Sequence, residues 1–249
     1  MAQSRIRALT LKKTKLGETD LIITMLAEDG CQVRAVAKGA RKPGAKLGGR
    51  VEPFTVIDAL VTEGRSLDII TDAEIVMSNQ ALREDYDRSI AASVVADFLD
   101  KVSVECQAED RLFALATTTF SVMASAPVAD LLALVVAFLL KGMAMHGYRP
   151  QFGACAECGS CEQLTARFSL DLGGPLCEGC GAGPDVVPLT TGTAHALHAL
   201  MGARMSEVGE LGIDEGTLAD AFAVARAFAV YHIPARLKAL AMYGASVAP

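Results

Sequence analysis

Five of the seven cysteines in this chain of 249 residues lie between positions 155 and 180. Four of them form two C-x-x-C-G turns, Cys155 with Cys158 and Cys177 with Cys180, separated by eighteen residues. A C-x-x-C turn directs two thiolates at one metal ion, and the glycine after it permits a tight backbone path. The spacing therefore predicts a four-cysteine site for one zinc ion.

Four protein ligands would fill the tetrahedron and leave no position for water or substrate, so the zinc is expected to be structural. Cys161 also has C-x-x-C spacing from Cys158 but no glycine after it, and we expect it not to be a ligand. A redox-active thiol pair is the alternative interpretation of the cluster. The histidines are scattered and predict no site: His146, His195, His198 and His232.

A second feature is a stretch of basic residues and glycines between positions 38 and 50. It follows a strand-like segment whose alternation places Arg34 and Lys38 on one face. We expect a flexible loop and then a strand; the stretch lacks the Lys-Ser/Thr ending of a nucleotide-binding P-loop. The predicted contacts to a nucleic-acid backbone are Arg34, Lys38, Arg41, Lys42, Lys46 and Arg50, with Lys12, Lys13 and Lys15.

Aromatic residues are scarce in the same region. Phe54 is the one aromatic residue among the first 75, and the chain has no tryptophan. Because single-strand recognition commonly stacks bases on aromatic rings, binding here should instead depend on phosphate contacts. It should be salt-sensitive and only weakly sequence-specific.

The charge of the chain is divided unevenly. The whole chain carries −6, but residues 1 to 50 contain eleven Lys or Arg against four Asp or Glu. This asymmetry predicts an N-terminal region that binds a polyanion, while the rest of the chain is acidic. A signal peptide is not expected, the apolar run at 131–140 is too short to span a membrane, and a cytoplasmic location follows.

The N-terminal segments are short, rich in β-branched residues and interrupted by glycine. Residues 20–27 and 31–38 flank an Asp-Gly step, which predicts a hairpin. Further strands are expected at 6–12, 54–61 and 67–75. Five short strands predict a small closed barrel, possibly of OB-fold type.

Helical spacing begins near residue 80, where Ile90, Val94, Phe98 and Val102 recur every four residues. Further helices are expected at 111–125, 128–146, 191–205, 217–232 and 234–243. The predicted class is α+β and multidomain. The predicted parts are an OB-fold at 1–78, a helical domain at 79–150 and 185–249, and a zinc-binding insert at 151–184.

Several motifs, in the same order along the chain, resemble the RecO family of bacterial DNA repair and recombination proteins. They are Leu11-Lys12-Lys13, Gly17-Glu18-Thr19-Asp20, Val36-Ala37-Lys38-Gly39-Ala40-Arg41, Val51-Glu52-Pro53-Phe54, Ala81-Leu82-Arg83-Glu84-Asp85 and Gly147-Tyr148-Arg149-Pro150. The resemblance covers about residues 9–181. It implies an N-terminal OB-fold, a helical domain and a four-cysteine zinc module.

The resemblance also implies a function without an active site. It implies binding of single- and double-stranded DNA, annealing of complementary strands and help in loading RecA. The implied partners are RecR, the acidic C-terminal tail of single-strand-binding protein and, indirectly, RecA, within the bacterial nucleoid and with no membrane partner. Two other hypotheses stay open: a zinc-stabilised adaptor whose basic region binds acidic proteins, and a cysteine-dependent redox enzyme.

Overall fold

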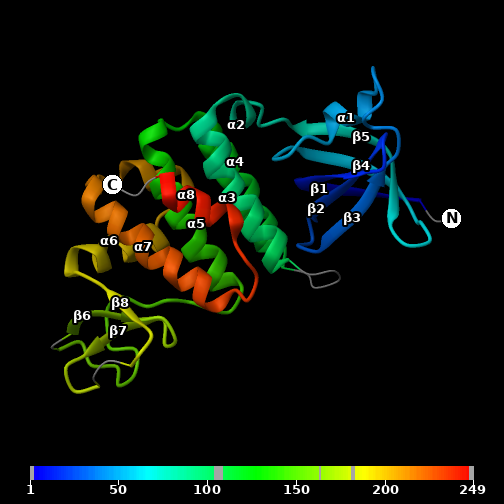
Figure 1. Cartoon of the computed structure of the whole chain (residues 1–249). Helices are drawn as coiled ribbons and strands as arrows, with labels where there is room; N and C mark the ends of the chain where they lie inside the picture. Colours follow the sequence, from blue (N-terminus) through cyan, green and yellow to red (C-terminus); the bar gives the residue numbers. More distant parts are fainter. Residues whose placement is uncertain (1–2, 104–108, 163, 181–182, 247–249) are drawn as a thin grey trace. The chain divides into compact units, whose positions relative to one another are not determined.

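The computed structural model describes residues 3–103, 109–162, 164–180 and 183–246. These residues pack as two compact units, one of residues 1–92 and 96–125 and the other of residues 93–95 and 126–249. The change from strands to helices follows Met77, the last residue of the fifth strand (Figure 1). The boundaries of the three predicted domains stay a prediction.

Five strands of the first unit form a closed barrel in the order β1-β2-β3-β5-β4. Only β3 and β5 run parallel among these neighbours. This is the predicted OB-type barrel, and the predicted hairpin is the turn between β2 and β3. The strands are β1 (Gln3–Leu16), β2 (Asp20–Ala27), β3 (Gln32–Ala37), β4 (Val56–Thr62) and β5 (Asp68–Met77).

Alternation along each strand builds the barrel core. Ile23 and Met25 of β2 lie inside with Ala35 and Ala37 of β3, all fully buried. The residues between them on β3 are exposed or half-buried, as a period of two requires. Arg34, the basic residue of β3, therefore lies on the outside of the barrel.

Two expectations for this region were wrong. The segment after Gly44 is not a loop followed by a strand but begins with a short helix, α1 (Lys46–Arg50), which contacts β5. The fourth strand starts at Val56 rather than at residue 54, because Phe54 has a positive φ of 69° that a strand cannot accommodate.

Three helices lie wholly or mostly in the first unit: α2 (Ala81–Glu84), α3 (Tyr86–Val102), of which residues 93–95 belong to the second unit, and α4 (Asp110–Ser125). The Phe54 and Phe120 rings join the barrel to α4 at a centroid separation of 5.3 Å. Arg83 donates hydrogen bonds to the carbonyl oxygens of Pro53 (2.8 Å) and Ser78 (2.7 Å). Two of the motifs of the sequence, around Phe54 and Arg83, thus form one joint between barrel and helices.

The second unit is built around α5 (Leu131–Met145), which contacts α6 and α7. Lys141 of α5 donates hydrogen bonds to the carbonyl oxygens of Met201 (2.6 Å) and Ala203 (2.8 Å). It thereby supplies a donor to carbonyl groups at the C-terminal end of α6. Burial lowers the pKa of Lys141. The other helices of this unit are η1 (Val128–Asp130), α6 (Thr191–Gly202), η2 (Met205–Leu211), α7 (Glu215–His232) and α8 (Lys238–Ser246).

One described helical stretch, Val128–Met145, is long and apolar enough to cross a membrane, and 61% of it is buried inside the protein. This stretch is longer than the apolar run at 131–140 that the sequence shows, because it includes the residues on either side of that run. Eleven of the α5 residues are buried, as in a helix at the centre of a helical unit.

The remaining helices mostly follow the sequence pattern. The last helix begins at Lys238 rather than at residue 234, and the helix from residue 191 ends at Gly202. Between α5 and α6 lies a small sheet of order β7-β6-β8, with β6 (Leu164–Ser169), β7 (Gly174–Cys177) and β8 (Val186–Pro188). We call residues 151–188 the cysteine module.

Candidate metal centre and nucleic-acid interface

The four predicted zinc ligands meet in the cysteine module. The sulfur atoms of Cys155, Cys158, Cys177 and Cys180 lie within 4.8 Å of one another. The Cys158 and Cys177 sulfurs are 3.6 Å apart, which suits the edge of a tetrahedron with Zn–S bonds of about 2.3 Å. Cys161 is exposed and is not part of this cluster.

Local backbone contacts shape the first cysteine turn. The N–H of Cys155 donates to the carbonyl oxygen of Ser160 (2.7 Å), and the N–H of Gly159 donates to that of Cys155 (2.9 Å). Gly159 has a φ of 77°, a conformation in which a side chain would be strained. The glycine after the second cysteine therefore has the backbone role that the motif predicts.

The electrostatics of the cluster suit a cation. Backbone N–H groups, that of Cys158 first, lower the pKa of Cys155 to about 6. Contacts with the Cys158 and Cys177 sulfurs raise the pKa of Cys180. Four thiols this close cannot all ionise without a positive charge between them, and a bound cation supplies that charge. The residues present therefore fit a metal ion.

On the barrel, the structure separates the nine predicted basic residues into groups. Strand register pairs Lys12 with Thr24 and Thr24 with Arg34, so Lys12 and Arg34 share a row on the outer face. Lys13 and Lys15 pair with the core residues Ile23 and Leu21 and lie at the end of the barrel. Arg41 and Lys42 are exposed in the loop before α1, and Lys46 is exposed at its start.

The loop after β3 is held by the turn between β1 and β2. The N–H of Gly39 donates to the Asp20 carboxylate (2.7 Å), and the Arg41 guanidinium donates to the carbonyl oxygen of Gly17 (3.0 Å). The N–H of Gly39 and the hydroxyl of Thr19 lower the pKa of Asp20. The loop that was expected to be flexible is thus held at its first residues by Asp20, whose negative charge gave no indication of a role at a basic surface.

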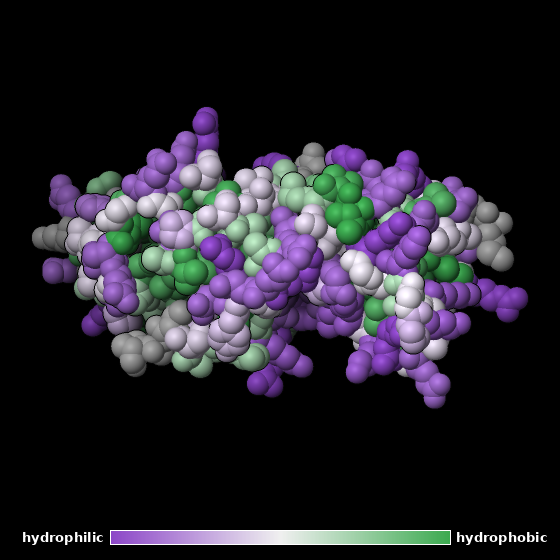
Figure 2. Space-filling view, turned by 90° about the horizontal axis from the view of Figure 1, so that it is seen from above, coloured by the Kyte–Doolittle hydropathy of each residue, from purple (hydrophilic) through white to green (hydrophobic). Residues whose placement is uncertain are grey.

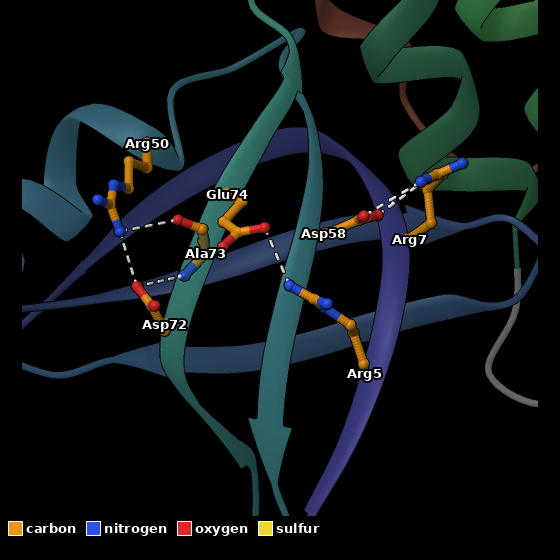
Figure 3. A network of polar contacts seen from close by, with 7 residues as sticks. All are labelled: Arg5, Arg7, Arg50, Asp58, Asp72, Ala73 and Glu74. Atoms are coloured by element: carbon orange, nitrogen blue, oxygen red, sulfur yellow. Dashed lines mark hydrogen bonds and ion pairs between the residues drawn. The ribbon is translucent and has the colours of Figure 1, made fainter.

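A different part of the barrel surface carries paired charges. Arg5 of β1 contacts Glu74 of β5 (2.9 Å), and Arg7 contacts Asp58 of β4 (2.9 Å). Arg50 contacts Asp72 (2.7 Å) and also donates to the carbonyl oxygen of Ala73. We call these three arginines and three carboxylates the charge ladder (Figure 3). Its arginines are neutralised by the protein.

Three of the nine predicted residues have acidic partners: Lys12 lies 3.7 Å from Asp100, Lys13 lies 2.6 Å from Glu52, and Arg50 belongs to the charge ladder. Five others make no ion pair within the described residues: Lys15, Arg34, Lys38, Lys42 and Lys46. With Arg41 they form what we call the basic surface.

The rest of the barrel exterior is also polar. Its exposed large hydrophobic residues, within the described strands, are Leu16, Ile75, Val76 and Met77. Figure 2 shows mainly hydrophilic side chains on the barrel, at the right of the view. Phe54 is buried against Phe120, so it offers no ring to a base. The barrel can offer a nucleic acid charge, but not stacking.

Comparison with known proteins agrees with this arrangement. The family described as "Recombination protein O N terminal" matches residues 1–79, and "Recombination protein O C terminal" matches residues 83–241. The chain is 34% identical over 245 residues to "DNA repair protein RecO" of Nocardioides sp., covering 95% of this chain and 97% of the relative.

Two further relatives carry the same name. That of Rubrobacter xylanophilus is 32% identical over 238 residues, 94% of each chain. That of Bifidobacterium longum is 35% identical over 183 residues, 72% of this chain and 74% of the relative. With a barrel, a helical part and a cysteine cluster in the order that the resemblance implied, the chain belongs to the RecO family of DNA repair proteins.

Proposed function

We propose that this protein is a DNA-binding recombination mediator. It anneals complementary strands and helps load RecA onto strands coated by single-strand-binding protein. The observation that carries the proposal is the basic surface: exposed cations, on the outside and at one end of an OB-type barrel, that make no ion pair with the residues that the structure describes.

The basic surface suits annealing because it contacts phosphates and leaves the bases free to pair. Lysine and arginine side chains neutralise phosphates and release counterions whatever the sequence. A protein that holds strands by their phosphates leaves the base edges open to pair with a second strand. It also accepts both single- and double-stranded DNA, since both present a phosphate backbone.

The metal in the cysteine module is zinc in this proposal. Four thiolates and no open position suit Zn²⁺ in a structural role. The metal would hold together a module whose small core, around Cys155, Leu176 and Cys177, is too limited to fold alone. No chemical step is needed, and we propose that the protein is not an enzyme.

The proposed partners follow from the family. They are DNA in single- and double-stranded form, RecR, the acidic C-terminal tail of single-strand-binding protein and, through these, RecA. The proposed location is the bacterial cytoplasm, at the nucleoid. A membrane partner is not proposed, since α5 buries its apolar side chains within the protein.

The test is annealing of two complementary oligonucleotides, each precoated with single-strand-binding protein, across a salt series. Acceleration that fades as salt rises is expected, because the contacts are electrostatic. If annealing is not accelerated while DNA binding persists, the mediator role fails. If DNA does not bind at all, the adaptor for acidic proteins becomes the better hypothesis.

A further inference from the structure

Large aromatic side chains are rarely exposed in this protein. All nine phenylalanines and Tyr243 are buried, and there is no tryptophan. The exposed tyrosines are Tyr86 (76%), Tyr148 (38%) and Tyr231 (41%). Two of these three lie together in the second unit.

Tyr148 and Tyr231 are linked through a shared neighbour. The rings of Tyr148 and His232 are stacked, with centroids 4.3 Å apart and planes 27° apart. The Tyr231 ring meets the His232 ring edge-on with centroids 5.1 Å apart, and the centroids of His146 and Tyr148 are 6.0 Å apart. We call these four residues the aromatic row; they come from the segment after α5 and from the end of α7 (Figure 1).

The aromatic row is held in place by its own polar atoms. The Nε2–H of His232 donates to the carbonyl oxygen of Leu170 (2.8 Å), and the Tyr231 hydroxyl donates to Asp185 (3.4 Å). The N–H of Tyr148 donates to the carbonyl oxygen of Met143 (2.8 Å), after a turn in which Gly147 has a φ of 95°. These bonds position the His232 and Tyr231 side chains and the backbone of Tyr148.

Docking of the cysteine module onto α7 accounts for only part of this arrangement. The interior of that contact is made by Phe168, which packs on Phe228 and Phe152 and is fully buried. The Tyr148 hydroxyl has no hydrogen-bond partner within the described residues. Rings that served docking alone would be covered like Phe168, whereas Tyr148 and Tyr231 each leave about two fifths of their surface in water.

The two segments that carry the row are followed in sequence by cations that make no ion pair within the described residues. Arg149 follows Tyr148 directly, and Arg236 and Lys238 follow His232 within six residues; all three are exposed and make no ion pair within the described chain. Two carboxylates, Asp171 and Asp185, face Tyr231. Burial and these two carboxylates raise the pKa of Tyr231, so the phenol stays protonated.

We propose that Tyr148 and Tyr231 form a stacking surface for the bases of single-stranded nucleic acid, with Arg149, the residue after Tyr148, contacting its phosphates. Half-exposed aromatic rings next to a cation are an arrangement by which proteins bind single strands without reading their sequence. The site supplies what the barrel lacks, since the aromatic side chain of the barrel, Phe54, is buried. The inference rests on the proposed DNA-binding function.

The test compares two probes on the full-length, metal-loaded protein: a fluorescein-labelled oligo(dT) and an abasic oligonucleotide of the same length and charge. Fluorescence anisotropy measures the affinity for each. Tyr148→Ala with Tyr231→Ala should weaken oligo(dT) binding by about tenfold or more and leave abasic binding unchanged, because stacking is lost and phosphate contacts are not. Tyr148→Phe with Tyr231→Phe keeps the rings and should bind oligo(dT) as the unchanged protein does.

The matched control is Tyr86→Ala, which removes the other exposed tyrosine and should change neither affinity. The inference is overturned if the double Ala variant binds oligo(dT) normally, or if it loses both probes equally. It is also overturned if the double Phe variant loses oligo(dT) as the Ala variant does. If the unchanged protein binds neither probe, the proposed function itself fails.

Discussion

The carboxylate of Asp20 accepts a hydrogen bond from the N–H of Gly39, at 2.7 Å and across nineteen residues of sequence. A negative charge thus lies at the base of the loop that carries Arg41 and Lys42. Electrostatics alone would make this carboxylate unfavourable for binding a polyanion. Its geometry gives it a positioning role, because it fixes where the loop leaves β3.

Asp20→Ala separates these two effects. We expect DNA affinity to fall by about threefold to tenfold, since a loop that has lost its anchor must be ordered on binding. The control is Glu18→Ala, which removes an exposed carboxylate from the same turn and should leave affinity unchanged or slightly raised. Binding that tightens equally in both variants would show that charge, and not position, governs this turn.

The same anchor predicts a pH dependence. Because the pKa of Asp20 is lowered in the folded protein, its contribution is fully present above the ordinary pKa of aspartate. It is lost only as pH falls through the lower, folded value. The amide resonance of Gly39, followed by NMR, should stay constant from pH 7 to about 5 and titrate with a midpoint below about 3.9. A midpoint above that value would contradict the hydrogen bond.

The distinction between the basic surface and the charge ladder is tested by salt dependence. Lys42→Ala with Lys46→Ala should weaken binding to all sequences and reduce the slope of log K against log salt by about one per lost contact. Arg5→Ala with Arg7→Ala removes the same charge from the ladder, where carboxylates already neutralise it. If both double variants reduce the slope of log K against log salt equally, the ion pairs of the charge ladder break when DNA binds.

Loss of the proposed zinc ion should affect one part of the chain. Cys177→Ser, or chelation, is expected to unfold the cysteine module, since a structural zinc contributes on the order of 10 kcal/mol. Hydrogen exchange should rise in β6 and β7, while the barrel stays protected. The control Cys161→Ser should keep one zinc ion per chain, measured by atomic absorption. Loss of zinc from that variant would place Cys161 among the ligands.

Arg83 is expected to matter for stability. Arg83→Ala removes the Arg83 donor from the carbonyl oxygen of Pro53 and leaves that of Ser78 with the longer bond from the Thr55 hydroxyl (3.3 Å). The substitution should lower the free energy of unfolding by about 2 kcal/mol. Arg65→Ala, in the exposed turn between β4 and β5, should change it little. Urea denaturation measures both, and equal values would show that Arg83 adds nothing to the joint.

The fold was predictable where the sequence pattern is local. Alternation and the Asp-Gly step identified β2 and β3, and four-residue spacing identified α3, because each pattern depends on neighbours within one element. The cysteine cluster was predictable for a different reason. A C-x-x-C turn is itself a local structure, and two such turns at this spacing can together supply the four ligands of one metal ion.

What the sequence did not reveal depends on contacts between distant residues. The helix α1 contains Gly48 and Gly49 and has little intrinsic helix propensity, so its contact with β5 must stabilise it. The pairing of Arg50 with Asp72 depends on the barrel closing. The aromatic row brings together Tyr148 and His232, 84 positions apart, and no periodicity connects them.

The cysteine module leaves the helical unit and returns to it at one place. Phe152, near its beginning, and Leu189, just after β8, line the same cavity of about 350 Å³ beside α6. When the ends of an insertion are already together, the entropy of closing it grows only slowly with the number of residues inserted. The helical unit can therefore accept a longer or shorter segment between α5 and α6 at little conformational cost, which makes this junction a natural position for variation in chain length.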